Sequence, residues 1–253
     1  MAERTIVLSR SAVDDADRRG FEDEVIAGLG SAGSMTVVVP SVYWLSEEGR
    51  GLWALRGIAG DLVLACWLYP RAGYWILRGQ GVEGVFDEGG EAASGDESGD
   101  GGRRVRVVDL RGFDSPEACV EALLVEAGDC VEGGVCSRVE VIDEAVSLRW
   151  YPVLDESRCI HCKQCHDFCL FGVYALDADG HVRAVSPDSC KPGCPACARI
   201  CPVGAIMFPH FRDEVIAGAP AEEVEEADAS AESASDGRDE LDDLIDALDE
   251  LDV

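Results

Sequence analysis

The residues with the clearest chemistry are eight cysteines between positions 159 and 201 of the 253-residue chain. Two residues separate Cys159 from Cys162 and Cys162 from Cys165, and three more precede Cys169. A second run contains the other four cysteines: Cys190, Cys194, Cys197 and Cys201. Thiolates at such short intervals allow one tight loop to place three sulfurs around an iron–sulfur cube, which takes its fourth ligand from elsewhere.

Zinc is the alternative metal for these cysteines, because two Cys₄ zinc sites would use the same eight thiolates. Zinc ribbons usually present two separated pairs of cysteines. Here three closely spaced cysteines are combined with a distant Cys201-Pro202, which is typical of iron–sulfur clusters. The spacing therefore favours clusters over zinc, and also over disulfides.

Over about residues 151–212, the chain resembles the bacterial ferredoxins with two [4Fe–4S] clusters, in which the fourth cysteine of each run binds the other cluster. The resemblance implies two ligand sets, namely Cys159, Cys162, Cys165 and Cys201 for the first cluster and Cys190, Cys194, Cys197 and Cys169 for the second. Two departures are Leu170, where the family has proline, and the three residues 191–193, where it usually has two. We expect Gly193 to absorb the additional residue. Whether the two clusters share one potential stays open, and we expect low potentials.

An internal repeat accompanies the cysteines, since residues 169–176 align with residues 201–208. In each copy we expect a short helical turn, a glycine (Gly172 or Gly204) and an apolar strand. Two copies would form a pseudo-twofold α+β domain around the clusters. We expect apolar side chains to exclude water from the sulfurs, namely those of Ile160, Phe168, Phe171, Val173, Ile200, Val203 and Ile206.

Residues 1–150 predict an α/β domain with a mostly parallel sheet, and we recognise no family in them. Aliphatic runs predict strands at 5–8, 36–39, 62–66 and 105–110, separated by helices at 13–29, 47–58 and 115–127. Ser115 and Pro116 are typical of a helix start. Gly28, Gly30 and Gly33 have the spacing of a dinucleotide-binding loop. They follow a helix and precede a strand, however, which predicts a helix end and a turn instead.

Loops at the carboxyl ends of these strands offer a second candidate site, because ligands of open α/β sheets bind there. Arg10, Tyr69 and Arg71 lie in such loops and would suit a small anionic or planar substrate. This is the alternative hypothesis of a redox enzyme whose α/β domain receives electrons from the clusters. Ordinary packing, or docking of the cluster domain, would explain the same residues.

The remaining cysteines and two histidines give weaker signals. Cys66 and Cys119 fit small core residues. Cys130 and Cys136, flanked by glycines, are a redox pair, a metal site or incidental, and their role stays open. His161 and His166 fit loop residues better than ligands, since the cysteines already complete both ligand sets.

The formal charge of −29 is concentrated in two segments. Residues 86–102 predict a disordered acidic loop. Residues 213–253 predict an acidic flexible tail that ends in a short amphipathic helix at 239–252, which would dock on this chain or on a partner. Such charge opposes binding to nucleic acid and to anionic membranes. With neither a secretion signal nor an apolar span, we expect a cytoplasmic protein without membrane insertion.

The sequence as a whole predicts an iron–sulfur electron-transfer protein, or the electron-delivering subunit of a cytoplasmic redox complex, with redox proteins as partners. We expect a non-catalytic carrier, since no catalytic constellation is evident. A third hypothesis makes the clusters structural or oxygen-sensing.

Overall fold

The structure, a computed structural model, describes residues 4–12, 15–87, 102–128 and 138–220. Three predictions lie outside these residues: most of the acidic loop at 86–102, the pair Cys130 and Cys136, and the tail helix at 239–252. Residues 1–218 form one compact unit, and the domain boundary near residue 150 stays a prediction. No helix in the described ranges is both long and apolar enough to cross a membrane.

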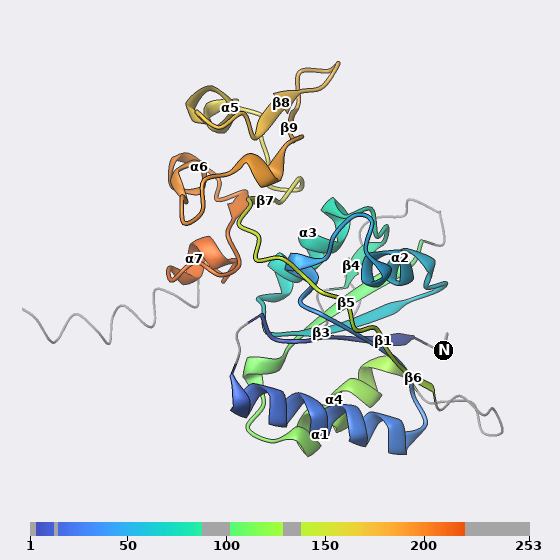
Figure 1. Ribbon diagram of the computed structural model, residues 1–253. Helices are drawn as coiled ribbons and strands as arrows, with labels where there is room; N and C mark the ends of the chain where they lie inside the picture. Colours follow the sequence, from blue (N-terminus) through green and yellow to red (C-terminus); the bar gives the residue numbers. More distant parts are fainter. Residues whose placement is uncertain (1–3, 13–14, 88–101, 129–137, 221–253) are drawn as a thin grey trace, which may run out of the picture. The chain divides into compact units, whose positions relative to one another are not determined.

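Six parallel strands form the sheet of the N-terminal part (Figure 1). Their spatial order is β4-β5-β3-β1-β2-β6, and every neighbouring pair is parallel. The strands are β1 Thr5–Ser9, β2 Met35–Val39, β3 Leu62–Cys66, β4 Val85–Asp87, β5 Arg104–Asp109 and β6 Arg138–Val141. Strands β1, β2 and β3 are almost entirely buried apolar runs, because helices cover both faces of a parallel sheet. The predicted mostly parallel α/β sheet is confirmed.

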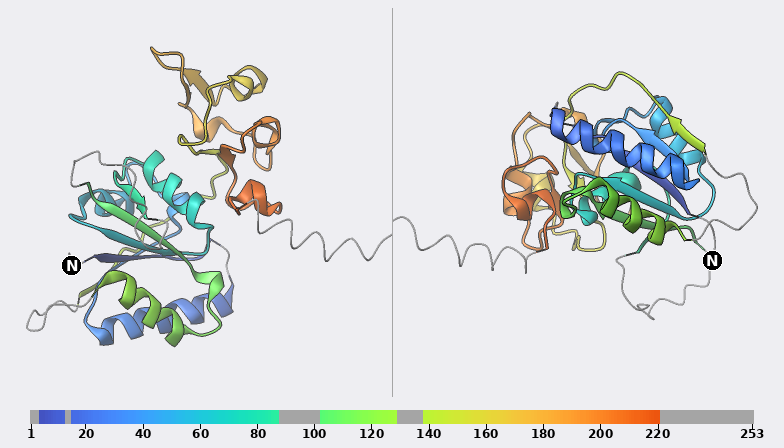
Figure 2. Two further views of the ribbon diagram at one scale, coloured as in Figure 1. Left: turned by 180° about the vertical axis from the view of Figure 1, so that it is seen from behind. Right: turned by 90° about the horizontal axis from the view of Figure 1, so that it is seen from below.

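Helices lie on both faces of this sheet (Figures 1 and 2). α1 Ala16–Ala32 and α4 Pro116–Ala127 pack together on one face. The other face carries α2 Arg50–Gly57, α3 Pro70–Gly79 and the short helix η1 Val42–Trp44. Another short helix, η2 Leu110–Gly112, follows β5. Ser115 caps α4 as predicted, since its side chain accepts a hydrogen bond from the Ala118 N–H.

The three spaced glycines end a helix, as the sequence predicts. Gly28 and Gly30 lie within the last turns of α1, and Gly33 forms its C-cap with φ of 83°. That left-handed conformation is readily available to glycine and closes helices frequently. These glycines therefore belong to a helix terminus and not to a phosphate-binding loop.

The segment after β3 differs from the prediction, which treated residues 69–75 as a ligand-binding loop. Helix α3 begins there at Pro70. Proline and glycine in sequence favour a loop, but proline at the first helical position is already in helical geometry. Gly73 lets the helix approach β5, because a Cβ at this position would lie 2.9 Å from Val107 Cγ1.

A buried carboxylate occupies the carboxyl edge of the sheet. Glu22 on α1 is fully buried and accepts hydrogen bonds from Arg10 Nη1 at 3.2 Å, the Ser11 N–H at 2.5 Å and Trp67 Nε1 at 2.8 Å. Arg10 also pairs with the exposed Asp23. The crevice where α/β proteins commonly bind ligands is filled here by the protein's own side chains.

The cysteine-rich part is built from two small antiparallel pairs and short helices (Figure 1). β7 Val153–Leu154 pairs with β10 Ile206–Met207, and β8 Tyr174–Leu176 pairs with β9 Val182–Ala184. The helices are α5 Gln164–Phe168, η3 Pro187–Ser189, α6 Ala196–Ile200 and α7 Glu214–Ala217. The ordered chain thus extends past residue 212, because Ile216 is buried and its carbonyl accepts a hydrogen bond from the Phe208 N–H.

Two tyrosines join the α/β part to the start of the cysteine-rich part. The Tyr43 hydroxyl donates to the Tyr151 carbonyl at 2.6 Å, and the Tyr151 hydroxyl donates to the Tyr43 carbonyl at 2.8 Å. Their rings stack with centroids 4.2 Å apart, and both side chains are buried. The reciprocal bonds fix the chain just before it enters β7.

Removal of the buried carboxylate should destabilise the fold. We expect Glu22→Ala to lower the free energy of unfolding by about 3 kcal/mol, because Arg10 and Trp67 would lose their buried acceptor. Urea denaturation of the two proteins measures this difference. The matched control is Asp23→Ala, which removes the exposed partner of Arg10 and should cost less than about 1 kcal/mol. Equal effects of the two substitutions would contradict the stabilising role that we assign to the buried Glu22 carboxylate.

Candidate iron–sulfur site

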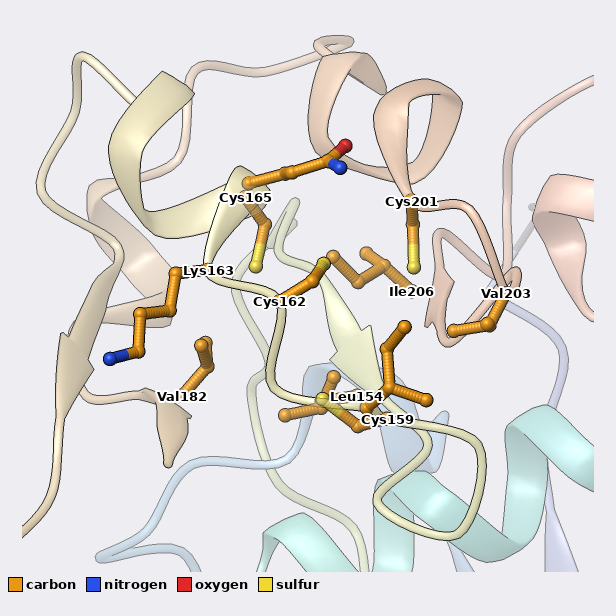
Figure 3. A pocket seen from close by; sticks show the side chains of 11 residues that line it. Leu154, Cys159, Cys162, Lys163, Cys165, Val182, Cys201, Val203 and Ile206 are labelled. Atoms are coloured by element: carbon orange, nitrogen blue, oxygen red, sulfur yellow. The ribbon is translucent and has the colours of Figure 1, made fainter. Parts of the chain in front are cut away.

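Four of the eight cysteines line one pocket. Figure 3 shows the side chains of Cys159, Cys162, Cys165 and Cys201 around this space, together with the apolar side chains of Leu154, Val182, Val203 and Ile206. Three of the cysteines come from one loop and the start of α5, whereas Cys201 follows α6 in the other half of the repeat. The structure thus brings together the four residues predicted for the first cluster.

The loop that carries these cysteines is tightly curled. His161 and Lys163 adopt positive φ of 51° and 67°, a conformation uncommon outside glycine. They flank Cys162, and Lys163 is the N-cap of α5, so Cys165 lies in the first turn of that helix. Two successive left-handed kinks bring three cysteines of a seven-residue segment to one side of the chain.

Backbone N–H groups are directed at the sulfurs of this group. The Ala205 N–H donates to Cys201 Sγ at 3.3 Å. Burial raises the pKa of the Cys165 thiol to about 11, and the backbone N–H of His166 opposes this rise. Burial also raises the pKa of Cys159, against the backbone N–H of His161. The raised pKa values of Cys159 and Cys165 favour their protonated forms without metal, whereas the N–H groups are placed to stabilise bound thiolates.

The other four cysteines are also close to one another. Burial raises the pKa of Cys190 to about 12, and the charges of Cys197, Cys194 and Cys169 add to the effect. Cys190 and Cys197 are buried, and Cys197 lies in α6. Gly193, directly before Cys194, has φ of 78°, so it provides the turn expected for the additional residue.

The two halves of the repeat have nearly the same backbone. Cys169 ends α5 with φ of −73° and ψ of 111°, and Cys201 ends α6 with −73° and 112°. Gly172 and Gly204 follow with φ of 68° and 56°. The matching angles place each of these cysteines at the same point of its half.

The donor chemistry fits the expected metal group. Each set offers four soft sulfur ligands, apolar neighbours and N–H donors, which suits an iron–sulfur cluster. Tetrahedral zinc would use the same sulfurs, and metal analysis distinguishes the two.

The expected water exclusion is only partly present. Val173 and Ile206 are buried as expected, and Ile160, although exposed, lines the pocket of the first four cysteines. Phe168 and Phe171 are exposed. Leu170 beside them is 91% exposed. Several exposed apolar side chains therefore lie in the segment that carries the cysteines.

Asp155 fixes the turn that leads into Cys159, a role that the sequence did not reveal. This side chain is 2% exposed, and its Oδ1 accepts hydrogen bonds from Ser157 N, Ser157 Oγ and Arg158 N at 2.6–3.1 Å. Its Oδ2 accepts from Arg71 Nε at 2.7 Å. The Asp-x-Ser sequence was the available signal, since aspartate commonly accepts from the N–H two residues on in such turns.

Arg71, for which the sequence left ligand binding, ordinary packing and docking of the cluster domain open, connects the α/β part to the cysteine-rich part. Besides Asp155, it donates to the carbonyl of Gly204, close to Cys201. Arg10 is bound to Glu22, and the Tyr69 ring lies under the Arg111 guanidinium at 3.8 Å. The three predicted ligand-binding residues are therefore each engaged within the protein and do not meet around one cavity.

The other sequence predictions concern cysteines and histidines outside the ligand sets. Cys66 and Cys119 are buried core residues, and burial raises the pKa of their thiols to about 12 and about 11. His161 Nδ1 accepts from the Val182 N–H at 3.3 Å, and His166 contacts Asp167. His161 Nδ1 also lies 3.5 Å from Cys159 Sγ, so this histidine neighbours a predicted ligand, whereas His166 contacts a carboxylate.

Two curated proteins of Methanocaldococcus jannaschii are similar to part of the chain. An uncharacterized ferredoxin is 41% identical over 63 residues, which cover 24% of this chain and 42% of that protein. The pyruvate synthase subunit PorD is 40% identical over 55 residues, which cover 22% of this chain and 62% of that subunit. The chain thus spans about two fifths and three fifths of their lengths. No protein-family model matches the chain, and no solved structure does.

These similarities support a ferredoxin-like iron–sulfur domain with a role in electron transfer. They agree with the clustering of thiols in the structure. The similarity covers only the shorter part of the chain, so the α/β part is described here by its geometry alone.

Loss of the Asp155 carboxylate should loosen the cysteine loop. We expect Asp155→Ala to lower the free energy of unfolding by about 3 kcal/mol, because Arg71 and the turn N–H groups lose a buried acceptor. Urea denaturation measures this loss of stability. The amount of iron that the variant retains after dialysis should also be lower than that of the wild type. Glu156→Ala is the control, since this neighbour forms a half-exposed ion pair with Arg183 and should cost less than about 1 kcal/mol. If Asp155→Ala were as stable as Glu156→Ala, Asp155 would not hold the turn before Cys159 as we infer.

Iron-free protein should lose stability above about pH 9. The unfolded thiols ionise near 9.0, whereas Cys165, Cys190 and Cys197 in the folded protein hold their protons to about 11 or 12. Because the folded state then binds more protons, stability is present below pH 9 and declines as pH rises. Urea denaturation of iron-free protein at several pH values between 8 and about 10 tests this decline in the free energy of unfolding, because tyrosines ionise only at higher pH. Metal-loaded protein should decline less, since the eight ligand thiols no longer carry protons. A flat iron-free profile would contradict the prediction.

Proposed function

We propose that this protein carries two [4Fe–4S] clusters in residues 151–212 and acts as an electron carrier or as the electron-delivering subunit of a redox complex. The first ligand set is Cys159, Cys162, Cys165 and Cys201, and the second is Cys190, Cys194, Cys197 and Cys169. The observation that carries the proposal is the convergence of three cysteines of one loop with a fourth from the other half of the repeat. When bound, each cluster accepts and releases one electron.

The chain's own residues have three tasks in this proposal. The thiolates hold iron, and the N–H groups of Ala205, His161 and His166 stabilise the negative charge on the sulfurs. Buried apolar side chains such as Ile206 keep water from the sulfurs. None of these tasks requires an acid, a base or a nucleophile, which is why we propose a non-catalytic role.

The exposed apolar residues beside the cysteine loops suit contact with a redox partner. Cys162 is itself exposed, and Ile160, Phe168 and Leu170 surround the loops with apolar surface. Electron transfer needs close approach of the partner, and a patch of this kind allows it. The similarity to a subunit of a pyruvate synthase supports delivery of electrons to a larger enzyme. We further propose that the acidic tail, with its helix at 239–252, contributes to docking.

A reducing compartment fits the thiol chemistry. The ten cysteines in the described part of the chain are all free, and Cys66 and Cys119 are enclosed in the core. We therefore propose a cytoplasmic location, where such thiols stay reduced.

Metal analysis of anaerobically prepared protein tests the proposal. We expect brown protein with about eight irons and about eight sulfides per chain, and reduction by a low-potential donor should bleach the colour. Cys165→Ser and Cys197→Ser should each lower the iron content. Cys66→Ala should leave it unchanged, since this buried cysteine belongs to neither set. Colourless protein with two zinc ions per chain would overturn the function.

A further inference from the structure

Tyr174 is a buried tyrosine whose hydroxyl lies among the cysteines. It is the first residue of β8, is 7% exposed and packs in one apolar cluster with Cys165, Cys190 and Cys197. Within the described residues, its hydroxyl has no hydrogen-bond partner, sulfur acceptors included. A buried O–H without an acceptor is unfavourable, so the position calls for an acceptor that the polar groups of the protein do not provide.

Three cysteines act electrostatically on this hydroxyl. Burial raises the pKa of Tyr174, and the charges of Cys197, Cys165 and Cys169 raise it further, Cys197 most of all. The phenol conversely lowers the pKa of Cys197, as expected if its O–H points toward that sulfur. Two of these three cysteines belong to the second ligand set. The hydroxyl therefore faces the second site more than the first.

The first site has no equivalent hydroxyl. In the internal repeat, Tyr174 aligns with Ile206, since each lies two residues after the positive-φ glycine of its half. Ile206 lines the pocket of the first four cysteines. The backbone around the two positions is alike, so the difference between the sites lies in the side chain: a phenol at one and a methyl-bearing aliphatic chain at the other.

We propose that, when the second cluster is bound, the Tyr174 hydroxyl donates a hydrogen bond to the Cys197 sulfur and makes that cluster easier to reduce than it would otherwise be. This inference rests on the proposed two-cluster function. A hydrogen bond to a ligand sulfur withdraws negative charge from it, so the site accepts an added electron more readily. Burial strengthens the bond, because few other dipoles screen it. The first site, with Ile206, lacks this contribution.

The decisive variant is Tyr174→Phe, which removes one oxygen and keeps the ring. Iron and sulfide content are measured first, and both should stay at the wild-type values. Redox titration followed by electron paramagnetic resonance should then show that one of the two midpoint potentials becomes more negative, while the other is unchanged. Loss of one hydrogen bond predicts a change of roughly tenfold in the reduction equilibrium constant, about 59 mV for one electron.

Tyr74→Phe is the matched control. It removes the same oxygen from a tyrosine of α3, whose hydroxyl bonds to the Gly84 carbonyl in the α/β part. Neither potential should move in this variant. Two unchanged potentials in a fully loaded Tyr174→Phe protein, or an equal shift of both, would overturn the inference and leave the two-cluster function intact. Wild-type protein without about eight irons would instead overturn the function itself.

A second measurement serves if the variant does not assemble its metal. A crystal structure of the anaerobic wild-type protein gives the distance from Tyr174 Oη to Cys197 Sγ directly. A distance within about 3.5 Å, with the O–H directed at the sulfur, supports the bond. A distance beyond about 4 Å, or a water molecule bonded to the hydroxyl in place of sulfur, excludes it.

Discussion

Sulfur atoms from both halves of the repeat must meet in one small volume, and the cysteine-rich part of the molecule is built around this requirement. The first pocket combines three cysteines of one loop with Cys201 from the other half. Neither half can therefore complete its group alone. The β7–β10 pairing, the two short helices and the positive-φ residues of the loops all serve to hold the halves at this separation.

The α/β part contributes to the same arrangement from outside. Arg71 at the start of α3 binds Asp155 and the Gly204 carbonyl, so one guanidinium holds the turns beside Cys159 and Cys201 together. The Tyr43–Tyr151 pair fixes the chain a few residues earlier. The side chains at the carboxyl edge that a substrate would need are engaged in these and similar contacts. Through these contacts the α/β part supports the turns beside Cys159 and Cys201.

The sequence predicted the features that depend on local spacing and missed those that depend on distant pairing. Cysteine intervals and continuous apolar runs are local signals, so the gathered cysteines and the parallel sheet could be foreseen. Helix α3 was missed because Pro70 and Gly73 favour a loop when considered without their neighbours, and the need for glycine arises only from the contact with Val107. Arg71 and Asp155 are separated by 84 positions, and nothing in either local sequence indicates the other.

The repeat also explains how one chain provides two unlike environments. Its backbone is nearly identical at Cys169 and Cys201, so the fold itself treats both halves alike. The differences lie in the cysteine loops, where Lys163 takes a positive φ that Pro195 at the matching position cannot adopt. N–H directions and neighbouring side chains then differ between the groups. The N–H donors and side chains around the ligand cysteines set the reduction potential of a cluster. Two clusters held by this chain would therefore differ in potential, and electrons would pass preferentially in one direction between them.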